Sequence, residues 1–349
     1  SAFAGPDLDT RVHDLEKQMK QVRTETASQT YGANTATARP NVHGYGFFLT
    51  FDILYWQTKV GGTEYALTDQ DTLGVMPVSG KYRGIDFKWD WAFRAGIGYN
   101  FLHGEWDLYA DYTYYKNNTC SMVTGELNGS VIPQRGSRQA AGGGSQFNSV
   151  NKATSEYKFE FDRIDLELGR NYYISRDLSF RPHFGLVTAW INQKQLTRYT
   201  GGPTIGVNTV HVKDRNDFWG IGPRTGVNSK WHFTDGFSIM GNVSGALVYG
   251  NFGVRHKNWL SSDPVTHQVN VSANMHRFTP TASLQLGLAY DRYIYNDKQH
   301  IGISLSWDTQ YWWRMNQMLN CIEDQPLKYI RQSDDISIQG ITLNLRLDF

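Results

Sequence analysis

Charged side chains recur at every second position in several stretches of this chain, and that spacing places them on one face of an extended strand. Asp107 and Asp111 share a face in one stretch, while Arg163, Asp165 and Glu167 share a face in another. If such strands close into a barrel, opposed guanidinium and carboxylate groups would set up a transverse electric field inside it. That field would act on small charged or dipolar solutes. In a narrow barrel the same charges could instead pair with one another and fill the interior.

Strand parity predicts that twelve charged or titratable side chains point into this interior. They are Arg94, Asp107, Asp111, Arg163, Asp165, Glu167, Arg181, His183, Arg224, Lys230, Asp308 and Arg346. Acidic and basic groups are both present in the set, so the interior should contain both signs of charge. Function must come from this face, because the opposite face would contact lipid.

The sequence lacks the residue patterns on which most enzymes depend. Its ten histidines never stand at a His-x-x-x-His spacing, and it contains no Gly-x-Ser-x-Gly turn and no phosphate-binding glycine loop. A net charge of +1 without a Lys/Arg cluster argues against a nucleic-acid partner. We therefore predict a protein without enzymatic activity, without a cofactor or metal, and without nucleic acid as a partner.

The element that positions these side chains is clearest in residues 85–101. Small or polar residues there alternate with the apolar residues Phe87, Trp89, Trp91, Phe93, Ala95, Ile97, Tyr99 and Phe101. Strands of soluble proteins are usually about five or six residues long, whereas an outer-membrane strand needs about 9 to 11. The pattern predicts a membrane-crossing strand with one face toward lipid, and an unusually long soluble strand is the alternative.

Ten stretches share this pattern or a close variant of it. Their predicted ranges are 44–60, 85–101, 105–115, 155–173, 178–196, 217–233, 237–250, 277–290, 300–313 and 336–349. Short and long connections alternate between them, as is typical of outer-membrane barrels with tight periplasmic turns and large external loops. The predicted fold class is all-β, an antiparallel transmembrane β-barrel of ten strands. Residues 204–212 and 265–273 are also β-like, so twelve strands are an alternative.

One irregularity is predicted in the fourth of these strands. Its apolar residues occupy odd positions up to Phe161 and even positions from Ile164 onward. A β-bulge inserts one extra residue and thereby reverses the faces of the residues that follow. The change of parity therefore predicts a bulge near Asp162 and Arg163.

The residues before the barrel divide into a helix and a linker. Apolar residues of the first 25 recur at heptad spacing, namely Leu8, Val12, Leu15, Met19 and Val22. We predict a periplasmic helix over residues 1–25, used as a short coiled coil that joins copies of the chain into a homotrimer. A helix that packs on its own barrel or stays free is the alternative. Residues 26–43 form a linker rich in Thr, Ala, Ser and Asn, and residues 44–349 form the barrel.

Two cysteines, Cys120 and Cys321, are predicted to lie in external loops beyond the third and ninth strands. A disulfide between them would close a loop of about 200 residues and stabilise the fold by roughly 5 kcal/mol in the chain-entropy description. Two free or intermolecular thiols are the alternative, because these strands are not neighbours in the barrel.

The last strand ends on an aromatic residue. Leu345, Leu347 and Phe349 continue one apolar face to the final position of the chain. This ending looks like the terminal strand that bacterial barrel-assembly machinery recognises. We therefore expect that machinery to be a partner, and these three residues to be the assembly signal.

Three segments resemble the pore-forming major outer-membrane proteins of Legionella and of chlamydia-like bacteria. They are residues 44–56, 162–170 and 178–186, which read GYGFFLTFDILYW, DRIDLELGR and LSFRPHFGL. The resemblance extends over most of residues 44–349. It implies a porin-like channel in the bacterial outer membrane for passive diffusion of small hydrophilic solutes or ions. A structural or adhesive surface protein with a plugged barrel and partner-binding loops is the alternative.

Overall fold

The computed structural model describes residues 46–69, 79–101, 105–125, 131–136, 149–175, 177–203, 205–234, 236–294, 299–324 and 327–349. The predicted helix at residues 1–25, with its heptad, and the linker at residues 26–43 lie outside these ranges. Within the described ranges, no helix is long and apolar enough to span a membrane.

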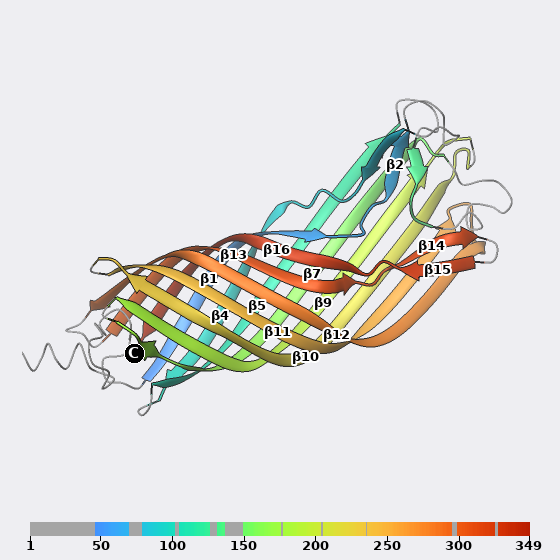
Figure 1. Cartoon of the computed structure of the whole chain (residues 1–349). Helices are drawn as coiled ribbons and strands as arrows, with labels where there is room; N and C mark the ends of the chain where they lie inside the picture. Colours follow the sequence, from blue (N-terminus) through green and yellow to red (C-terminus); the bar gives the residue numbers. More distant parts are fainter. Residues whose placement is uncertain are drawn as a thin grey trace, which may run out of the picture.

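Ten antiparallel strands form a closed barrel (Figure 1). They are β1 (Gly46–Val60), β4 (Trp89–Asn100), β5 (Trp106–Thr124), β7 (Lys152–Arg170), β9 (Leu178–Thr200), β10 (Thr209–His232), β11 (Phe237–Leu260), β12 (Asp263–Ile294), β13 (Gln299–Asn316) and β16 (Asp334–Asp348). Consecutive strands pair along the ring, and the pairing of β1 with β16 joins its two ends. The predicted ten strands are confirmed. Residues 209–212 and 265–273 lengthen β10 and β12 instead of adding strands to the ring.

The two ends of the barrel differ. Gly46 and Phe349 lie side by side at the end with the short connections, which we call the short-turn end, where the Phe349 N–H donates to the Phe47 carbonyl. The opposite, long-loop end holds a small sheet of β2, β3 and β6 and a hairpin of β14 and β15 (Figure 1). The additional strands are β2 (Ala66–Asp69), β3 (Gly80–Arg83), β6 (Val131–Pro133), β8 (Tyr172–Tyr173), β14 (Leu319–Asp324) and β15 (Leu327–Arg331).

An apolar belt surrounds the outside of the barrel. It includes the exposed side chains Phe51, Ile53, Trp91, Phe93, Leu166, Leu186, Trp219, Ile221, Val243, Leu247, Phe278, Leu286, Leu305, Trp307 and Leu343. Aromatic rings gather near its edges, such as Tyr55 with Trp91 at one edge and Phe237 with Tyr290 at the other. Exposed apolar side chains flanked by aromatic girdles are the surface that a barrel presents to lipid.

Several strands continue beyond the belt toward the long-loop end. Their outward side chains become charged there, and Lys116 Nζ lies 2.8 Å from Glu160 Oε1 while Arg198 Nη1 lies 2.7 Å from Glu156 Oε1. Charged pairs of this kind belong in water, because lipid cannot solvate them. The barrel therefore projects out of the belt on this side.

The predicted strand at residues 85–101 begins later than expected. Strand β4 starts at Trp89, and Phe87 is buried inside the barrel, with its ring 5.2 Å from that of Tyr157. The backbone before Trp89 does not pair with a neighbouring strand and is held by hydrogen bonds from side chains. Gln57 Nε2 donates to the Phe87 carbonyl at 2.6 Å. Phe87 therefore does not follow the inward–outward alternation of β4, and its side chain points inward.

The predicted bulge near Asp162 and Arg163 is wrong. The pairing of β7 with β5 and with β9 passes through both residues without a shift of register. Phe161 points inward and Ile164 points outward, in agreement with unbroken alternation. The apolar residues of β7 therefore switch from its inner face to its outer face. They do so because the barrel interior becomes polar at the level where the outside becomes the apolar belt.

A single arginine holds the loops together at the long-loop end. Arg135 is buried, and it donates to Asp214 at 2.9 Å, to the Glu64 carbonyl at 3.0 Å and to Gln332 Oε1 at 2.9 Å. Asp214 also bonds to His256. Burial raises the pKa of Asp214, but His256 and Arg135 lower it more, so that it lies below its ordinary value.

We expect the stabilising effect of Asp214 to depend on pH. A carboxyl whose pKa is lowered in the fold stabilises it above the unfolded pKa of about 4, and this stabilisation is lost as the pH falls through the folded pKa. Replacing Asp214 by Asn should lower the free energy of unfolding at pH 7 by about 3 to 5 kcal/mol, because Arg135 keeps a buried charge without its carboxylate.

Unfolding midpoints of wild type and Asp214→Asn, measured from pH 7 to pH 2 in detergent, would check this. The difference should be full at pH 7 and shrink below about pH 4. Asp217→Asn is the matched control, because Asp217 lies on the same strand in an exposed pair with Arg215. A difference that stays constant down to pH 2 would contradict the prediction.

Candidate functional site

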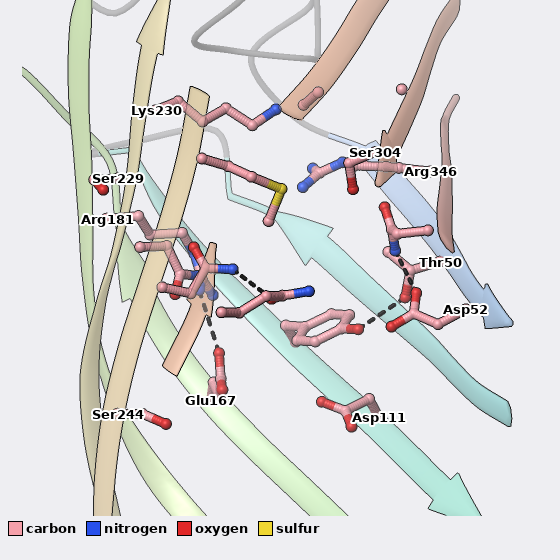
Figure 2. A pocket seen from close by; sticks show the side chains of 18 of the residues that line it. Thr50, Asp52, Asp111, Glu167, Arg181, Ser229, Lys230, Ser244, Ser304 and Arg346 are labelled. Carbon is pink, nitrogen blue, oxygen red and sulfur yellow. Dashed lines mark hydrogen bonds and ion pairs between the residues drawn. The ribbon is translucent and has the colours of Figure 1, made fainter. Parts of the chain in front are cut away.

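A polar cavity of ≈ 270 Å³ lies inside the barrel toward the short-turn end. Residues from opposite walls line it, and Figure 2 shows Asp52 and Arg346 across the cavity from Arg181 and Glu167. The alternation of each strand explains this lining, since every second side chain of a closed sheet points inward. Strand parity and closure of the ring together bring charges from distant parts of the sequence into one space.

All twelve side chains predicted to face inward do so. Ten of them line the cavity, and the buried Asp165 and His183 lie on the same inner face. Their inward placement was predictable because each follows the parity of an outward apolar neighbour. Their role as the lining of an ion path stays a prediction.

Arg94 is the centre of one ion-pair network. Its Nη1 lies 3.0 Å from Asp52 Oδ2 on β1, and its Nη2 lies 3.3 Å from Asp308 Oδ2 on β13. Its Nε donates to Thr113 on β5 at 3.0 Å. One guanidinium thus connects four strands, because its five N–H groups can serve several acceptors at once.

A second network links β5, β7, β9 and β10. Arg224 Nη1 lies 3.0 Å from Asp165 Oδ1 and 2.7 Å from Glu167 Oε1. Arg181 Nη1 lies 3.2 Å from Glu167 Oε2, and Arg181 Nε donates to Asp107 Oδ2 at 2.8 Å. Glu167 is therefore shared between two arginines, and losing it would leave both short of a partner.

One histidine and three aspartates near the cavity were not predicted. His300 lies between Asp291 and Asp348, with its Nδ1 2.8 Å from Asp348 Oδ2 and its Nε2 3.2 Å from Asp291 Oδ1. Asp348 could have been predicted to point inward, because it lies two residues after Arg346 on the same strand. Asp291 lies just past the predicted end of its strand, and Asp52 was obscured because β1 is apolar on both faces.

An apolar cap fills the barrel between the cavity and the long-loop end. We use this name for the buried side chains Trp56, Tyr115, Phe159, Phe161, Phe218, Phe252 and Trp312. Their rings touch across strands, with centroids 5.7 Å apart for Phe161 and Trp312 and 4.6 Å apart for Phe218 and Phe252. The Met315 carbonyl also accepts bonds from Gln193 and Asn216, which anchors β13 inside the barrel at this level.

Neither cysteine is in a disulfide. Cys120 is exposed on the outer face of β5 and Cys321 is half-buried on β14, so Cys120 lies within a strand instead of a loop. Strands β4, β1 and β16 separate β5 from β13, the strand that leads into β14. The proposed bond between the two is absent because the barrel wall holds them apart. Among the described residues, no group of three or more potential ligands could hold a metal ion.

Glu167→Gln should destabilise the fold by about 3 to 5 kcal/mol, because Arg181 and Arg224 would each lose a buried carboxylate partner. Urea unfolding in detergent micelles would measure this. Glu160→Gln is the control, since Glu160 lies on the same strand in an exposed pair with Lys116 and should cost about 1 kcal/mol or less. Equal midpoints for the two variants would show that the inner network contributes no more than a surface pair.

The similar solved structures share a tenth or less of their residues with this chain. No curated protein matches this chain. Among solved structures, the outer-membrane protease OmpT of Escherichia coli is 8% identical with a TM-score of 0.42, covering 87% of this chain and 96% of that one. The toluene transporter TodX of Pseudomonas putida is 10% identical with a TM-score of 0.32, covering 93% of each chain.

The family assignment comes from the sequence itself. Residues 42–349 match the family model described as the Legionella pneumophila major outer membrane protein precursor. This range contains the whole barrel, and it confirms the Legionella part of the resemblance noted in the sequence. The chain belongs to the Legionella major outer membrane protein family and is an outer-membrane β-barrel protein.

Proposed function

We propose that this protein is a narrow outer-membrane channel for passive diffusion of small hydrophilic solutes or ions. The observation that carries the proposal is the charged cavity inside the membrane-spanning part of the barrel. Ionised side chains at membrane depth are costly and commonly mark solute or ion pathways. A barrel that served only as a scaffold could fill the same space with apolar side chains at no loss of stability. In this proposal the short-turn end faces the periplasm and the long loops face outward.

The charges of the interior favour cations. Eight carboxylates take part in the inner networks, against six basic side chains. The carboxylates are Asp52, Asp107, Asp111, Asp165, Glu167, Asp291, Asp308 and Asp348, and the bases are Arg94, Arg163, Arg181, Arg224, Lys230 and Arg346. Counted without the histidines, these fourteen side chains have a formal excess of two negative charges. Fixed charge of one sign raises the local concentration of the opposite ion.

The apolar cap sets the limit on conduction. Its rings are in contact and almost completely buried, so ions reach the cavity from the long-loop end only when the cap is displaced. Hydrophobic constrictions of this kind gate channels by excluding water. We therefore propose brief, small openings instead of a steadily open pore.

The cap also favours a second candidate function. A barrel that is permanently filled would serve as a structural or adhesive surface protein, with the long loops as its binding surface. The Arg135 contacts support this candidate, because they hold loops over the same end of the barrel. Conduction separates the two. Neither candidate includes an enzymatic activity, and trimer formation and recognition of Phe349 by the assembly machinery stay predictions.

Widening the cap should increase conduction. In planar bilayers we expect brief, small openings from wild type and larger, longer openings from Phe161→Ala and from Trp56→Ala with Phe161→Ala, because each change removes ring volume from the constriction. Such truncations cost about 3 to 5 kcal/mol each, so folding must be verified by heat modifiability on gels. Trp91→Ala, on the lipid-facing side, is the control and should leave conductance unchanged.

Two outcomes would decide against the channel. A silent wild type with conducting cap variants would identify a permanently plugged barrel and favour the structural or adhesive function. Silence from every folded preparation would reject conduction through this barrel altogether.

Ion preference tests the interior charges directly. The reversal potential in a KCl gradient should show cation preference in wild type, and Asp52→Asn with Glu167→Gln should reduce it toward zero by removing the two excess charges. Glu160→Gln with Asp162→Asn removes the same charge from the outer face of β7 and should leave the potential unchanged. Anion preference in wild type would contradict the charge argument.

A further inference from the structure

The barrel wall has a notch between β12 and β13. The ladder between these two strands ends at the pair Thr281 and Trp312. Strand β12 extends beyond this pair to Asp263, and among the described strands this extension is bonded only to β11. Pro280 is the first residue past the ladder and has no N–H to donate, as is common at a strand edge. The backbone of β12 is therefore open on one side at the long-loop end.

The notch lies at the edge of the apolar belt. Phe278 on β12 is 59% exposed and Trp313 on β13 is 39% exposed, and they are the last outward apolar side chains before polar residues begin on their strands. Each is part of an aromatic pair, with Tyr249 4.9 Å from Phe278 and Tyr311 4.9 Å from Trp313. Aromatic residues concentrate at the level of lipid headgroups.

Three arginines meet at this notch. Arg277 precedes Phe278, Arg314 follows Trp313, and Arg331 ends β15. Arg277 Nη1 donates to Ser333 Oγ at 3.4 Å, which carries the side chain across the notch. Burial and the nearby charges of Arg314 and Arg331 lower the pKa of Arg277. The positive charges of Arg314 and Arg331 thus both act on the guanidinium group of Arg277.

No described carboxylate forms an ion pair with the side chains of this cluster. The described acid Asp335 accepts from the Tyr311 hydroxyl and from the Arg314 backbone N–H, both at 2.7 Å. That backbone bond accompanies a left-handed turn at Arg314, with φ of 54°. Two other cations on the outer surface are paired, Lys116 with Glu160 and Arg198 with Glu156. Within the described side chains, the three guanidinium groups therefore have no carboxylate as an ion-pair partner.

We propose that Arg277, Arg314 and Arg331 bind a phosphate group on the headgroup of an outer-leaflet lipid, whose acyl chains lie against Phe278 and Trp313. Guanidinium groups bind phosphate with two parallel hydrogen bonds, and three of them can surround one group. The aromatic pairs would place the lipid at the correct depth. The proposal rests on the orientation given above, in which the long loops face outward.

Binding can be measured without a membrane or a current. The probes are bis-phosphorylated lipid A and the same lipid with both phosphates removed, each in mixed detergent micelles. Wild type should bind the phosphorylated probe about tenfold or more tightly, and R277Q/R314Q/R331Q should lose this preference. The control variant K116Q/R198Q/R215Q removes three exposed cations elsewhere on the outer surface and should stay within about twofold of wild type.

Equal losses in the two triple variants would overturn the proposal, because they would show a general charge effect. Competition by millimolar inorganic phosphate with no preference for the lipid would also overturn it, in favour of a free-anion site. The single variant Arg331→Gln, at an exposed position, should weaken binding of the phosphorylated probe even if the triple variant folds poorly. A wild type that binds the lipid but never conducts would support this site and reject only the channel.

Discussion

A strand that crosses a bilayer has no water to bond its backbone, so its N–H and C=O groups must pair with other strands. Here that requirement is met by a ring in which β1 pairs with β16 and β9 pairs with β10. Ten strands enclose a narrow space, so side chains from opposite walls come within reach of one another. The contact of Arg94 on β4 with Asp308 on β13 follows from this closure.

The narrow interior is divided into two levels, one held together by ion pairs and the other by apolar packing. Around the cavity, charged groups are buried but paired, because an unpaired charge there would be far more costly than a paired one. Above it, the apolar cap fills the space by ring packing, as in the core of a soluble protein. The outside shows the reverse order, with the apolar belt around the cavity and charged side chains on the projecting part. Each wall strand therefore changes the chemistry of both faces along its length.

This change of chemistry along each strand explains which predictions from the sequence pattern were wrong. At Phe161 and Ile164 the apolar face switches sides while the ladder continues, so the switch records the edge of the membrane instead of an inserted residue. Phe87 shows a related effect, because it lies before the first ladder residue of β4 and is free to join the interior. The alternation of apolar residues thus predicts the direction of a side chain reliably within a paired strand whose two faces keep the same environment. The prediction fails where the strand crosses the edge of the membrane or where its pairing ends.

The sequence by itself determined the fold class, the ten strands and the inward direction of the twelve charged side chains. These depend on alternation within single strands, which is a local property of an extended chain. Only the tertiary structure decided which charges pair, where the apolar cap closes the barrel, and that Arg277, Arg314 and Arg331 meet at a notch. These contacts join strands that are distant along the chain, and they depend on the register and curvature of the whole ring. No local pattern contains that information.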